Sequence, residues 1–465
     1  MTYESTRDWA VGEFGTAALN DVRWRSRLMQ MAERAARQPN GRVTEVFANA
    51  AERQGAYGLL ENDKITAKDV GAAMVAATAR RCSDESVVFV AVDGSSLTLT
   101  DRYKCKDFGF IGPREDNARG LKMMNALAVS LEGVPLGLTA QIWWTRTGEA
   151  VKCRHAERPT SEKETRHWLS AMEQTRQQIQ AHAPQTRCWF QLDREGDAWP
   201  ILIQADEDGH WFTVRGSHDR RVRLADGTKS HLRTLLKEQA VTCHYNLPVS
   251  AGPGRRERTA VMAVRTATVT LDLRDKPSSR RFAKTLNVIM TRELSSAPDQ
   301  KPIEWMLLTN RPVETTEDVA QIIYGYSQRW RIEDFHRTWK SGACNVERMQ
   351  LRSVSAVMKW ATLLASVATR IERLKILSRT QPQRPALSEF SPLELRAIVL
   401  VRFGKKRPTL DGDKPSLKQA TQWLAEIGGY TGKSSGGPPG STVLARGMAQ
   451  MQIVANALEA LAQDP

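Results

Sequence analysis

One polar stretch in the C-terminal half of the chain carries side chains suited to chemistry. It runs from Tyr326 through Arg329 and Glu333 to Lys340, at spacings i, i+3, i+7 and i+14. If the stretch is helical, the four side chains fall within about 60° of one another on one face. A carboxylate there could hold a divalent metal ion, and the phenol and the two cations could grip phosphate oxygens. The pattern indicates either phosphoryl transfer on nucleic acid or an ordinary solvated helix face.

Two aspartates follow apolar segments elsewhere in the chain. Asp93 ends the valine-rich run from Ser86, and Asp193 ends a second run from Arg187. Short, continuous apolar runs are typical of buried central strands, and ligands in open α/β sheets gather at strand ends. Singly, each acid could equally be a turn or cap residue. Together with Glu333 they predict a three-carboxylate site, whose oxygen ligands suit two divalent ions for in-line displacement at phosphorus.

Composition indicates a globular protein with a polyanionic partner. The 465-residue chain has 41% hydrophobic and 26% charged residues and a net charge of +15. Most of the excess lies in residues 215–286, which contain 16 Lys and Arg against 6 Asp and Glu, a net of +10. Residues 1–70 carry 10 residues of each sign, although Arg23, Arg25 and Arg27 are grouped.

Cysteine spacing and hydropathy argue against several classes of protein. The six cysteines include no CxxC pair, which disfavours a zinc finger or a redox motif. The N-terminus has no apolar signal core, and no apolar run reaches the roughly 18 residues of a membrane span. The sequence therefore predicts a cytoplasmic protein with access to nucleic acid and no membrane partner.

The elements that must position the candidate residues fall into three predicted regions. Residues 1–70 read as short helices, which suit a DNA-binding domain or, equally, a helical cap on the next domain. Residues 71–377 read as a catalytic domain with a β-rich insertion at about 216–314. A long helix from about Thr316 to Gly342 then carries the polar stretch. Residues 378–465 read as a small helical module.

Within the catalytic region the expected order is strand, hairpin, helix, strand, helix and strand, with the first strand central. The hairpin turn is expected at Glu132-Gly133. This is the order of a ribonuclease H-like fold. The predicted fold class is therefore multidomain α/β, a ribonuclease H-like core with a β-rich insertion, flanked by helical N-terminal and C-terminal domains.

The candidate residues resemble the signature of cut-and-paste DDE transposases of bacterial insertion sequences, in particular the transposon Tn-five type. The resemblance covers nearly the whole chain up to about residue 375 and is weaker in the tail. It rests on the Tyr326, Arg329, Glu333 and Lys340 spacing and on four further segments: Asp193-Arg194-Glu195-Gly196-Asp197, Val92-Asp93-Gly94-Ser95-Ser96, Gln54-Gly55-Ala56-Tyr57 and Glu304-Trp305-Met306-Leu307-Leu308-Thr309.

This resemblance implies a metal-dependent DNA transposase. Asp93, Asp193 and Glu333 would bind two Mg²⁺ ions, for which Mn²⁺ could substitute. One site would cleave DNA at the transposon end, form and reopen a hairpin, and join the end to target DNA, without a nucleotide cofactor. The implied partners are double-stranded DNA, as terminal inverted repeats and as target, and a second copy of the chain in a synaptic complex. The implied location is the bacterial cytoplasm, at the nucleoid.

The resemblance also assigns DNA contacts. Tyr326, Arg329 and Lys340 would hold phosphates near the cleavage point. Trp305 would stack a flipped base and Trp330 would support the distorted end, whereas without the resemblance both read as core tryptophans. The remaining expected DNA contacts are Arg194, Arg215, Arg348, Arg23, Arg25 and Arg27, although the last three could instead form a solvated helix face.

One departure and two alternatives stay open. Leu444-Ala445-Arg446-Gly447 lacks a tryptophan that is common where the family dimerises, so the dimer has less support than the site. A catalytically silent, transposase-derived DNA-binding protein is one alternative, which the complete acidic triad disfavours. A ribonuclease H-like nuclease or resolvase without joining activity is the other, and it gives no reason for Trp305 beside a basic insertion.

Overall fold

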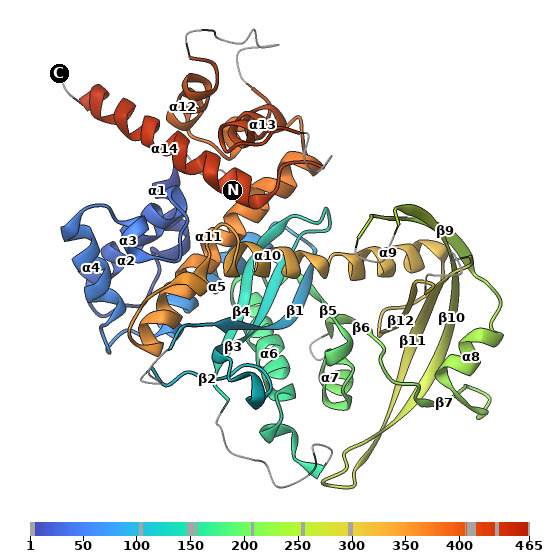
Figure 1. Cartoon of the computed structure of the whole chain (residues 1–465). Helices are drawn as coiled ribbons and strands as arrows, with labels where there is room; N and C mark the ends of the chain where they lie inside the picture. The colour runs from blue at the N-terminus through green and yellow to red at the C-terminus, as the bar shows by residue number, and fades with distance from the viewer. Residues whose placement is uncertain are drawn as a thin grey trace.

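A computed structural model describes residues 5–101, 106–146, 154, 157–205, 209–252, 256–295, 301–404, 406, 415–432 and 437–463. Its strands form one mixed sheet that runs through the molecule, and helices cover both faces of the sheet near its centre (Figure 1). A bundle of N-terminal helices and a group of C-terminal helices lie at one end of the molecule, and a mainly β lobe lies at the other (Figure 1).

The first part of the chain is helical, as expected. Its helices are α1 (Thr6–Phe14), α2 (Val22–Arg37), α3 (Val43–Val46), α4 (Ala50–Leu60) and α5 (Ala67–Cys82). Side chains of Ser5, Asp21 and Asn49 cap the N-termini of α1, α2 and α4. Helix α5 crosses the expected boundary at residue 70, because it packs on α1 and also on the central strands and helices.

The central strands confirm the expected strand order. They are β1 (Val87–Thr98), β2 (Gly109–Phe110), β3 (Arg119–Val129), β4 (Pro135–Trp144), β5 (Arg187–Leu192) and β6 (Trp211–Arg215). Strand β1 is central, pairing antiparallel with β3 and parallel with β5, while β4 pairs with β3 and β6 with β5. The β3–β4 turn contains Gly133 at φ 82°, a left-handed conformation that favours glycine.

Alternate residues of β1 face two different cores. Val88, Val90 and Val92 pack in a core that includes residues of α6 (Thr165–His182) and α7 (Trp199–Gln204). Phe89 and Ala91 face the opposite way, into a larger core shared with the helices that follow residue 315. By this alternation the side chain of Asp93 is directed toward those later helices.

The insertion is β-rich, as predicted, and it continues the same sheet. Its elements are β7 (Arg221–Arg223), β8 (Lys229–His231), α8 (Leu232–Glu238), β9 (Cys243–Val249), β10 (Arg258–Arg274), β11 (Arg281–Glu293) and β12 (Glu304–Thr309). Strand β12 returns to pair with β6, so the insertion extends the central sheet as the lobe on the right of Figure 1.

The prediction of one helix from Thr316 to Gly342 is wrong. The segment forms α9 (Thr316–Ser327) and α10 (Trp330–Lys340), joined at Gln328 and Arg329. Backbone bonds there tighten to i→i−3, with Arg329 N donating to Tyr326 O at 3.1 Å and Ile332 N donating to Arg329 O at 3.2 Å. The two helices still run nearly end to end across the front of the sheet (Figure 1).

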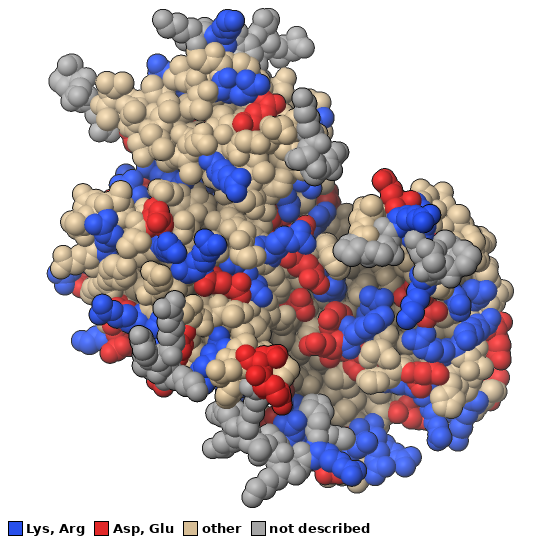
Figure 2. Space-filling view, in the orientation of Figure 1, with Lys and Arg blue, Asp and Glu red and all other residues tan. Residues whose placement is uncertain are grey.

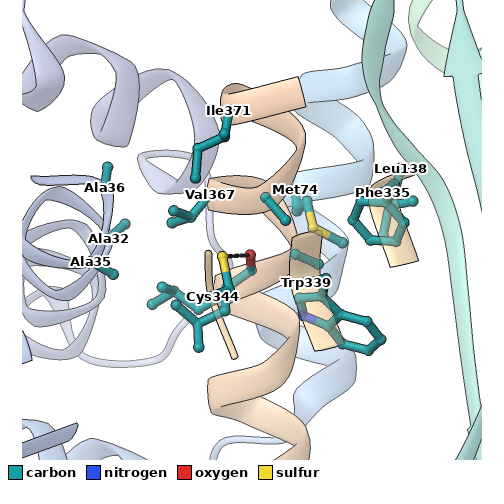
Figure 3. Packing of buried hydrophobic residues seen from close by; sticks show 14 of the residues in the cluster. Ala32, Ala35, Ala36, Met74, Leu138, Phe335, Trp339, Cys344, Val367 and Ile371 are labelled. Atoms are coloured by element: carbon teal, nitrogen blue, oxygen red, sulfur yellow. Dashed lines mark hydrogen bonds between the residues drawn. The ribbon is translucent and has the colours of Figure 1, made fainter. Parts of the chain in front are cut away.

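A long, buried helix joins the N-terminal bundle to the sheet. Helix α11 (Val354–Thr380) presents Val367 and Ile371 toward the alanines of α2 on one side, while Phe335 and Trp339 of α10 pack on the other (Figure 3). The Lys359 ammonium donates to the carbonyl oxygens of Leu60 and Asn62, both at 2.8 Å. These contacts fix the end of α4 against α11.

The remaining described elements complete the molecule. The C-terminal helices are α12 (Pro392–Phe403), α13 (Leu417–Ile427) and α14 (Ser441–Gln463), and short 3₁₀ turns include η1 (Arg114–Asp116), η3 (Thr160–Glu162), η4 (Arg194–Gly196), η6 (Val346–Arg348) and η7 (Ala386–Ser388). Helices α13 and α14 both pack on α11. In the described part of the chain, no helix combines the length and apolarity that crossing a membrane requires. Cys82, Cys188, Cys243 and Cys344 are free thiols, and Cys105 and Cys153 lie outside the described residues.

Candidate active site

The structure brings Asp93 and Asp193 together through strand pairing. Val92 and Leu192 are register partners in the parallel pair of β1 and β5, so the two aspartates follow neighbouring residues. Asp193 also caps η4, because its Oδ1 accepts a hydrogen bond from the Glu195 backbone N–H at 2.8 Å. Asp193 therefore has the cap role that the sequence allowed, and it also lies beside Asp93.

Glu333 approaches the same place from α10, and Arg329 lies between the acids. The Arg329 Nη2 group donates to Glu333 Oε1 at 3.0 Å, and Nη1 lies 3.9 Å from Asp93 Oδ2. The arginine is only 8% exposed, and among the described residues its Nη1 group has no hydrogen-bond partner. A buried guanidinium group thus offers an unsatisfied donor to Asp93.

Burial and neighbouring negative charge together affect the protonation of Asp93. Burial raises the pKa of Asp93 to about 7, and the negative charges of Asp193, Glu333 and Glu195 add to this effect. The nearby Arg329 lowers the pKa of Asp93 but does not cancel the increase. The acids of three separate elements therefore share one electrostatic environment.

This donor set fits a divalent cation by charge and by atom type. Burial is the main cause of the raised pKa of Asp93, and a bound cation would offset both the burial of its charge and the repulsion from the neighbouring acids. Carboxylate oxygens are also the ligands that Mg²⁺ prefers. Within the described ranges, however, no group of three or more His, Cys, Asp or Glu side chains is gathered closely enough to hold a metal ion. Arg329 supplies the counter-charge for Asp93 and Glu333 in this arrangement.

Tyr326 and Trp305 form an aromatic pair beside the acids. Their ring centroids lie 5.5 Å apart at an interplanar angle of 68°, an edge-to-face contact between α9 and β12. Burial raises the pKa of Tyr326, while the adjacent Arg329 and Arg215 lower it. Arg215 ends β6 and donates to the Glu304 carbonyl oxygen at 3.2 Å. Trp305 is half-buried, so it lines the site on the insertion side.

The other end of the polar stretch lies along β1. The Lys340 ammonium is 3.3 Å from Ser95 Oγ and 3.9 Å from Glu347 Oε1. Arg348 follows Glu347 in η6 and is exposed. Trp330 is 58% exposed, with the Arg329 guanidinium 5.8 Å from its ring, so it is a surface residue and not a core tryptophan.

Two further residues of the Asp193–Asp197 motif, the expected DNA contact Arg194 and the acid Asp197, have different surroundings. Arg194 is exposed on η4, beside Asp193. Asp197, the last residue of the same motif, is buried and accepts hydrogen bonds from the backbone N–H groups of Ser217 and His218. Asp197 therefore fixes the chain where it enters the insertion, which is a structural role.

The three N-terminal arginines lie on α2, in the bundle apart from the acids (Figure 1). Arg23 is exposed and pairs with Asp21 at 2.7 Å, and Arg25 is half-buried. The Arg27 guanidinium lies over Gly55 of α4, where an added Cβ would come within 2.6 Å of Arg27 Cζ. Gly55 thus leaves space for an arginine on the surface formed by α2 and α4.

A buried polar chain behind Asp93 escaped the sequence-based prediction. His336 Nε2 is 3.0 Å from Asn125 Nδ2, and Asn125 Oδ1 accepts from Gln141 Nε2 at 3.1 Å. Asn125 is fully buried and pairs in register with both Asp93 and Gln141. The sequence features that could have indicated this chain are two polar residues within the apolar strands of the hairpin, Asn125 and Gln141, and His336 in the helix that carries Glu333.

Comparison with protein-family models gives two matches. Residues 6–65, which include α1 to α4, match the model described as transposase DNA-binding. Residues 211–369 match the model described as a transposase DDE domain, and they include β6, the insertion, α9, α10 and most of α11. DDE transposase domains generally use divalent metal ions, in agreement with the donor set at Asp93, Asp193 and Glu333. The chain therefore carries a transposase DNA-binding domain followed by a DDE domain, and together they support a DDE transposase that binds DNA.

Proposed function

We propose that this protein is a cut-and-paste DNA transposase that resembles the transposon Tn-five type. The observation that carries the proposal is the placement of Asp93 between Asp193, at the end of the neighbouring strand, and the buried pair of Arg329 and Glu333. Tyr326 and Trp305 form an aromatic pair alongside. The proposed domains are a helical DNA-binding domain at 1–70, a ribonuclease H-like catalytic domain at 71–377 and a helical dimerisation domain at 378–465. The order β4-β3-β1-β5-β6, with β1 central, supports the ribonuclease H-like assignment.

In the proposed mechanism the three acids hold two Mg²⁺ ions, for which Mn²⁺ can substitute. The bound ions would activate the attacking oxygen and stabilise the leaving oxygen of each in-line displacement at phosphorus. Asp193 is supported from η4 and Glu333 from α10, so two rigid elements orient these carboxylates. Arg329 would orient Glu333 through the bond at 3.0 Å and present its free Nη1 group to negative charge.

The residues around the acids would position bent DNA. Tyr326 and Lys340 would contact phosphates on either side of Arg329, with Arg215, Arg194 and Arg348 as outer contacts. Stacking of a flipped base requires an accessible aromatic ring, and Trp305 is half-buried and makes an edge-to-face contact with Tyr326 beside the acids. Trp330 is exposed on the first turn of α10 and could support the distorted strand. This arrangement supports a hairpin intermediate.

The DNA end would be held by two separate surfaces. The N-terminal bundle, with Arg23, Arg25 and Arg27 on α2, would contact the terminal inverted repeat, and the basic insertion would contact the DNA backbone near the site. Target DNA would bind the same catalytic centre after cleavage. We infer a homodimer in a synaptic complex, through the C-terminal helices, in the bacterial cytoplasm at the nucleoid.

A cleavage assay on the element's own ends tests this proposal. The substrate would be a plasmid with the DNA that flanks the coding sequence on both sides, incubated with and without MgCl₂. We expect metal-dependent nicks, hairpin ends on denaturing gels, and joined products. Asp193→Asn should abolish all three, whereas Glu317→Gln, at an exposed acid on the first turn of α9, should not. Cleavage that survives Asp193→Asn would contradict the proposed site.

The same assay separates the two other candidate functions. A catalytically silent DNA-binding protein would bind the flanking DNA without any metal-dependent nick. A ribonuclease H-like nuclease or resolvase would cut the DNA but form neither hairpins nor joined products. The intact acids and the half-buried Trp305 favour the transposase.

A further inference from the structure

A hydrogen-bonded chain crosses the sheet behind Asp93, from α11 to α10. Thr362 of α11 donates to Gln141 Oε1 at 2.8 Å, and the Trp143 indole N–H donates to the same oxygen at 3.2 Å. Gln141 and Asn125 are register partners on β4 and β3. The chain ends at His336, whose Nδ1 lies 3.8 Å from Asp93 Oδ2.

The groups around Gln141 indicate a direction for this chain. An indole nitrogen is only a donor, and Trp143 Nε1 lies 3.2 Å from the side-chain oxygen of Gln141 and 3.3 Å from Thr362 Oγ1, so in this arrangement the oxygen of Gln141 faces both the indole and the threonine hydroxyl. The Gln141 amide nitrogen then donates to Asn125 Oδ1, which leaves Asn125 Nδ2 to donate to His336. His336 Nε2 must therefore be an acceptor without a proton, and a neutral ring carries its proton on Nδ1.

The protonated nitrogen faces one oxygen of Asp93. Nδ1 of His336 lies 3.8 Å from Oδ2, and Nη1 of Arg329 lies 3.9 Å from the same oxygen. Both distances exceed that of a hydrogen bond. The Arg329 guanidinium attracts the carboxylate by charge, the neutral His336 ring presents an N–H group to it, and both donors are placed to close onto Oδ2. Both nitrogens therefore face the same carboxylate oxygen, Oδ2.

We propose that His336 is a positioning residue for the metal ligand Asp93: its Nδ1–H, with Arg329 Nη1, holds Oδ2 and leaves Oδ1 for the metal ion. Hydrogen bonds from surrounding residues commonly orient carboxylate ligands and affect metal binding. The chain through Asn125 and Gln141 maintains the required tautomer, so α11 and the hairpin support the site from behind. This inference rests on the proposed function, which makes Asp93 a metal ligand.

The burial of the ring agrees with a single neutral tautomer. His336 is 7% exposed, so its ring meets the chain of side chains and little solvent. With Nε2 accepting from Asn125, the ring carries a single proton, and only the position of that proton remains to be set. The hydrogen-bonded chain sets that position.

Nitrogen NMR on the metal-free protein tests the tautomer directly. Histidine labelled with ¹⁵N reports which ring nitrogen carries the proton, and the chain has only 8 histidines. The His336 signal is identified by its absence from a His336→Gln sample. We expect a proton on Nδ1 and none on Nε2. A proton on Nε2, or on both nitrogens, would overturn the inference, whether or not the protein is a transposase.

Two substitutions separate positioning of Asp93 from support of the core. In His336→Asn the amide nitrogen is bonded to Cγ, as Nδ1 is in histidine, so a donor to Asp93 remains. In His336→Gln the amide group lies one bond farther from the backbone, as Nε2 does. The contact with Asn125 can then remain while the donor to Asp93 is lost. We expect His336→Gln to weaken Mn²⁺ binding and single-turnover nicking by about 10–100-fold, and His336→Asn to lower them by only a few-fold.

A larger loss of Mn²⁺ binding and nicking in His336→Asn than in His336→Gln would contradict the inference. That result is expected if His336 only supports the core through its buried hydrogen bond to Asn125. Mn²⁺ binding is measured by titration calorimetry without DNA, and thermal unfolding and metal-free DNA binding are measured for both variants. If either variant fails to fold, the tautomer measurement on the unmodified protein still decides. A wild-type protein with the Nδ1 proton but no metal-dependent nicking would count against the proposed function alone.

Discussion

Arg329 is close to two of the three acids, Glu333 and Asp93. It pairs with Glu333 at 3.0 Å and faces Asp93, yet one of its donor groups stays unpaired in a nearly buried position. Burial opposes its charge, but Tyr326, Glu333 and Asp93 outweigh burial and raise the pKa of Arg329. A permanently charged side chain thus lies where negative charge would gather during catalysis.

The raised pKa of Asp93 makes the metal-free protein sensitive to pH. Its pKa rises from 3.8 to about 7, so the folded state binds this proton more tightly than the unfolded chain does. Stability is therefore lost as the pH rises through that window. We expect Asp93→Asn to raise the free energy of unfolding at pH 8, by at most ~4 kcal/mol for about three pKa units, and to have little effect near pH 4.

Urea unfolding at several pH values, with chelator present, would measure this effect. The control is Asp116→Asn, at an exposed carboxylate in η1, which should not change the pH dependence. If the free energy of unfolding of Asp93→Asn depends on pH as it does in the wild type, the pKa of Asp93 is not raised in the folded protein.

At the scale of elements, the junction of α9 and α10 determines where the site residues point. Gly325 lies one turn before the junction and packs against Phe89 of β1 and Gln191 of β5, the two strands that carry the aspartates. The β3–β4 turn supports the other side, since a Cβ on Gly133 would lie 2.6 Å from Gln328 Oε1. The junction is therefore held between the sheet and the hairpin.

A methyl group at position 325 should disturb this junction. An added Cβ would lie 2.7 Å from Phe89 Cε1 and 3.3 Å from Gln191 Nε2. Because Phe89 is buried against Trp189, Gly325→Ala should destabilise the protein by about 1–3 kcal/mol. Cleavage should fall further than the loss of folded protein explains, since Arg329 would shift.

The control is Gly58→Ala in α4, where an added Cβ meets nothing within 4 Å and the helix should gain about 0.5–1 kcal/mol. Both variants are compared by thermal unfolding and by single-turnover nicking per folded molecule. A Gly325→Ala protein as stable and active as wild type would contradict the proposed role of the junction.

At the scale of the whole molecule, charge is distributed unevenly over the surface. Lys and Arg side chains cover much of the lobe formed by the insertion (Figure 2). At the turn end of the β10–β11 hairpin, Arg274 and Arg281 lie directly opposite each other in register and are exposed. Like charges in that position are unfavourable unless a polyanion offsets them, so DNA binding would explain their placement.

The salt dependence of DNA binding tests this surface. If Arg274 and Arg281 each neutralise a phosphate, the double variant Arg274→Gln/Arg281→Gln should reduce the slope of log K against log salt by about 1.8. Binding would be measured by fluorescence anisotropy on duplex DNA over a range of NaCl concentrations. Lys418→Gln, at an exposed residue of α13, is the control and should leave the slope unchanged. An unchanged slope in the double variant would exclude these residues from the interface.

The sequence by itself determined much of the fold, because the relevant signals are local. Apolar runs located β1 and β5 and the acids that follow them, and the glycine turn located the hairpin. Helical spacing placed Tyr326, Arg329, Glu333 and Lys340 on one side of the chain. The approximate elements that carry the proposed site residues therefore follow from the amino-acid sequence alone.

Only the tertiary structure decided how these residues meet, because their contacts join segments far apart in the sequence. The helix breaks at Gln328 and Arg329, next to the point where Gly325 packs on Phe89. The helical periodicity of the sequence does not predict this break, because Phe89 lies in a distant strand. Strand pairing, not spacing, puts Asp193 beside Asp93. The buried chain behind Asp93 links three strands and two helices, and a polar residue within an apolar run gains its role only from partners that folding supplies.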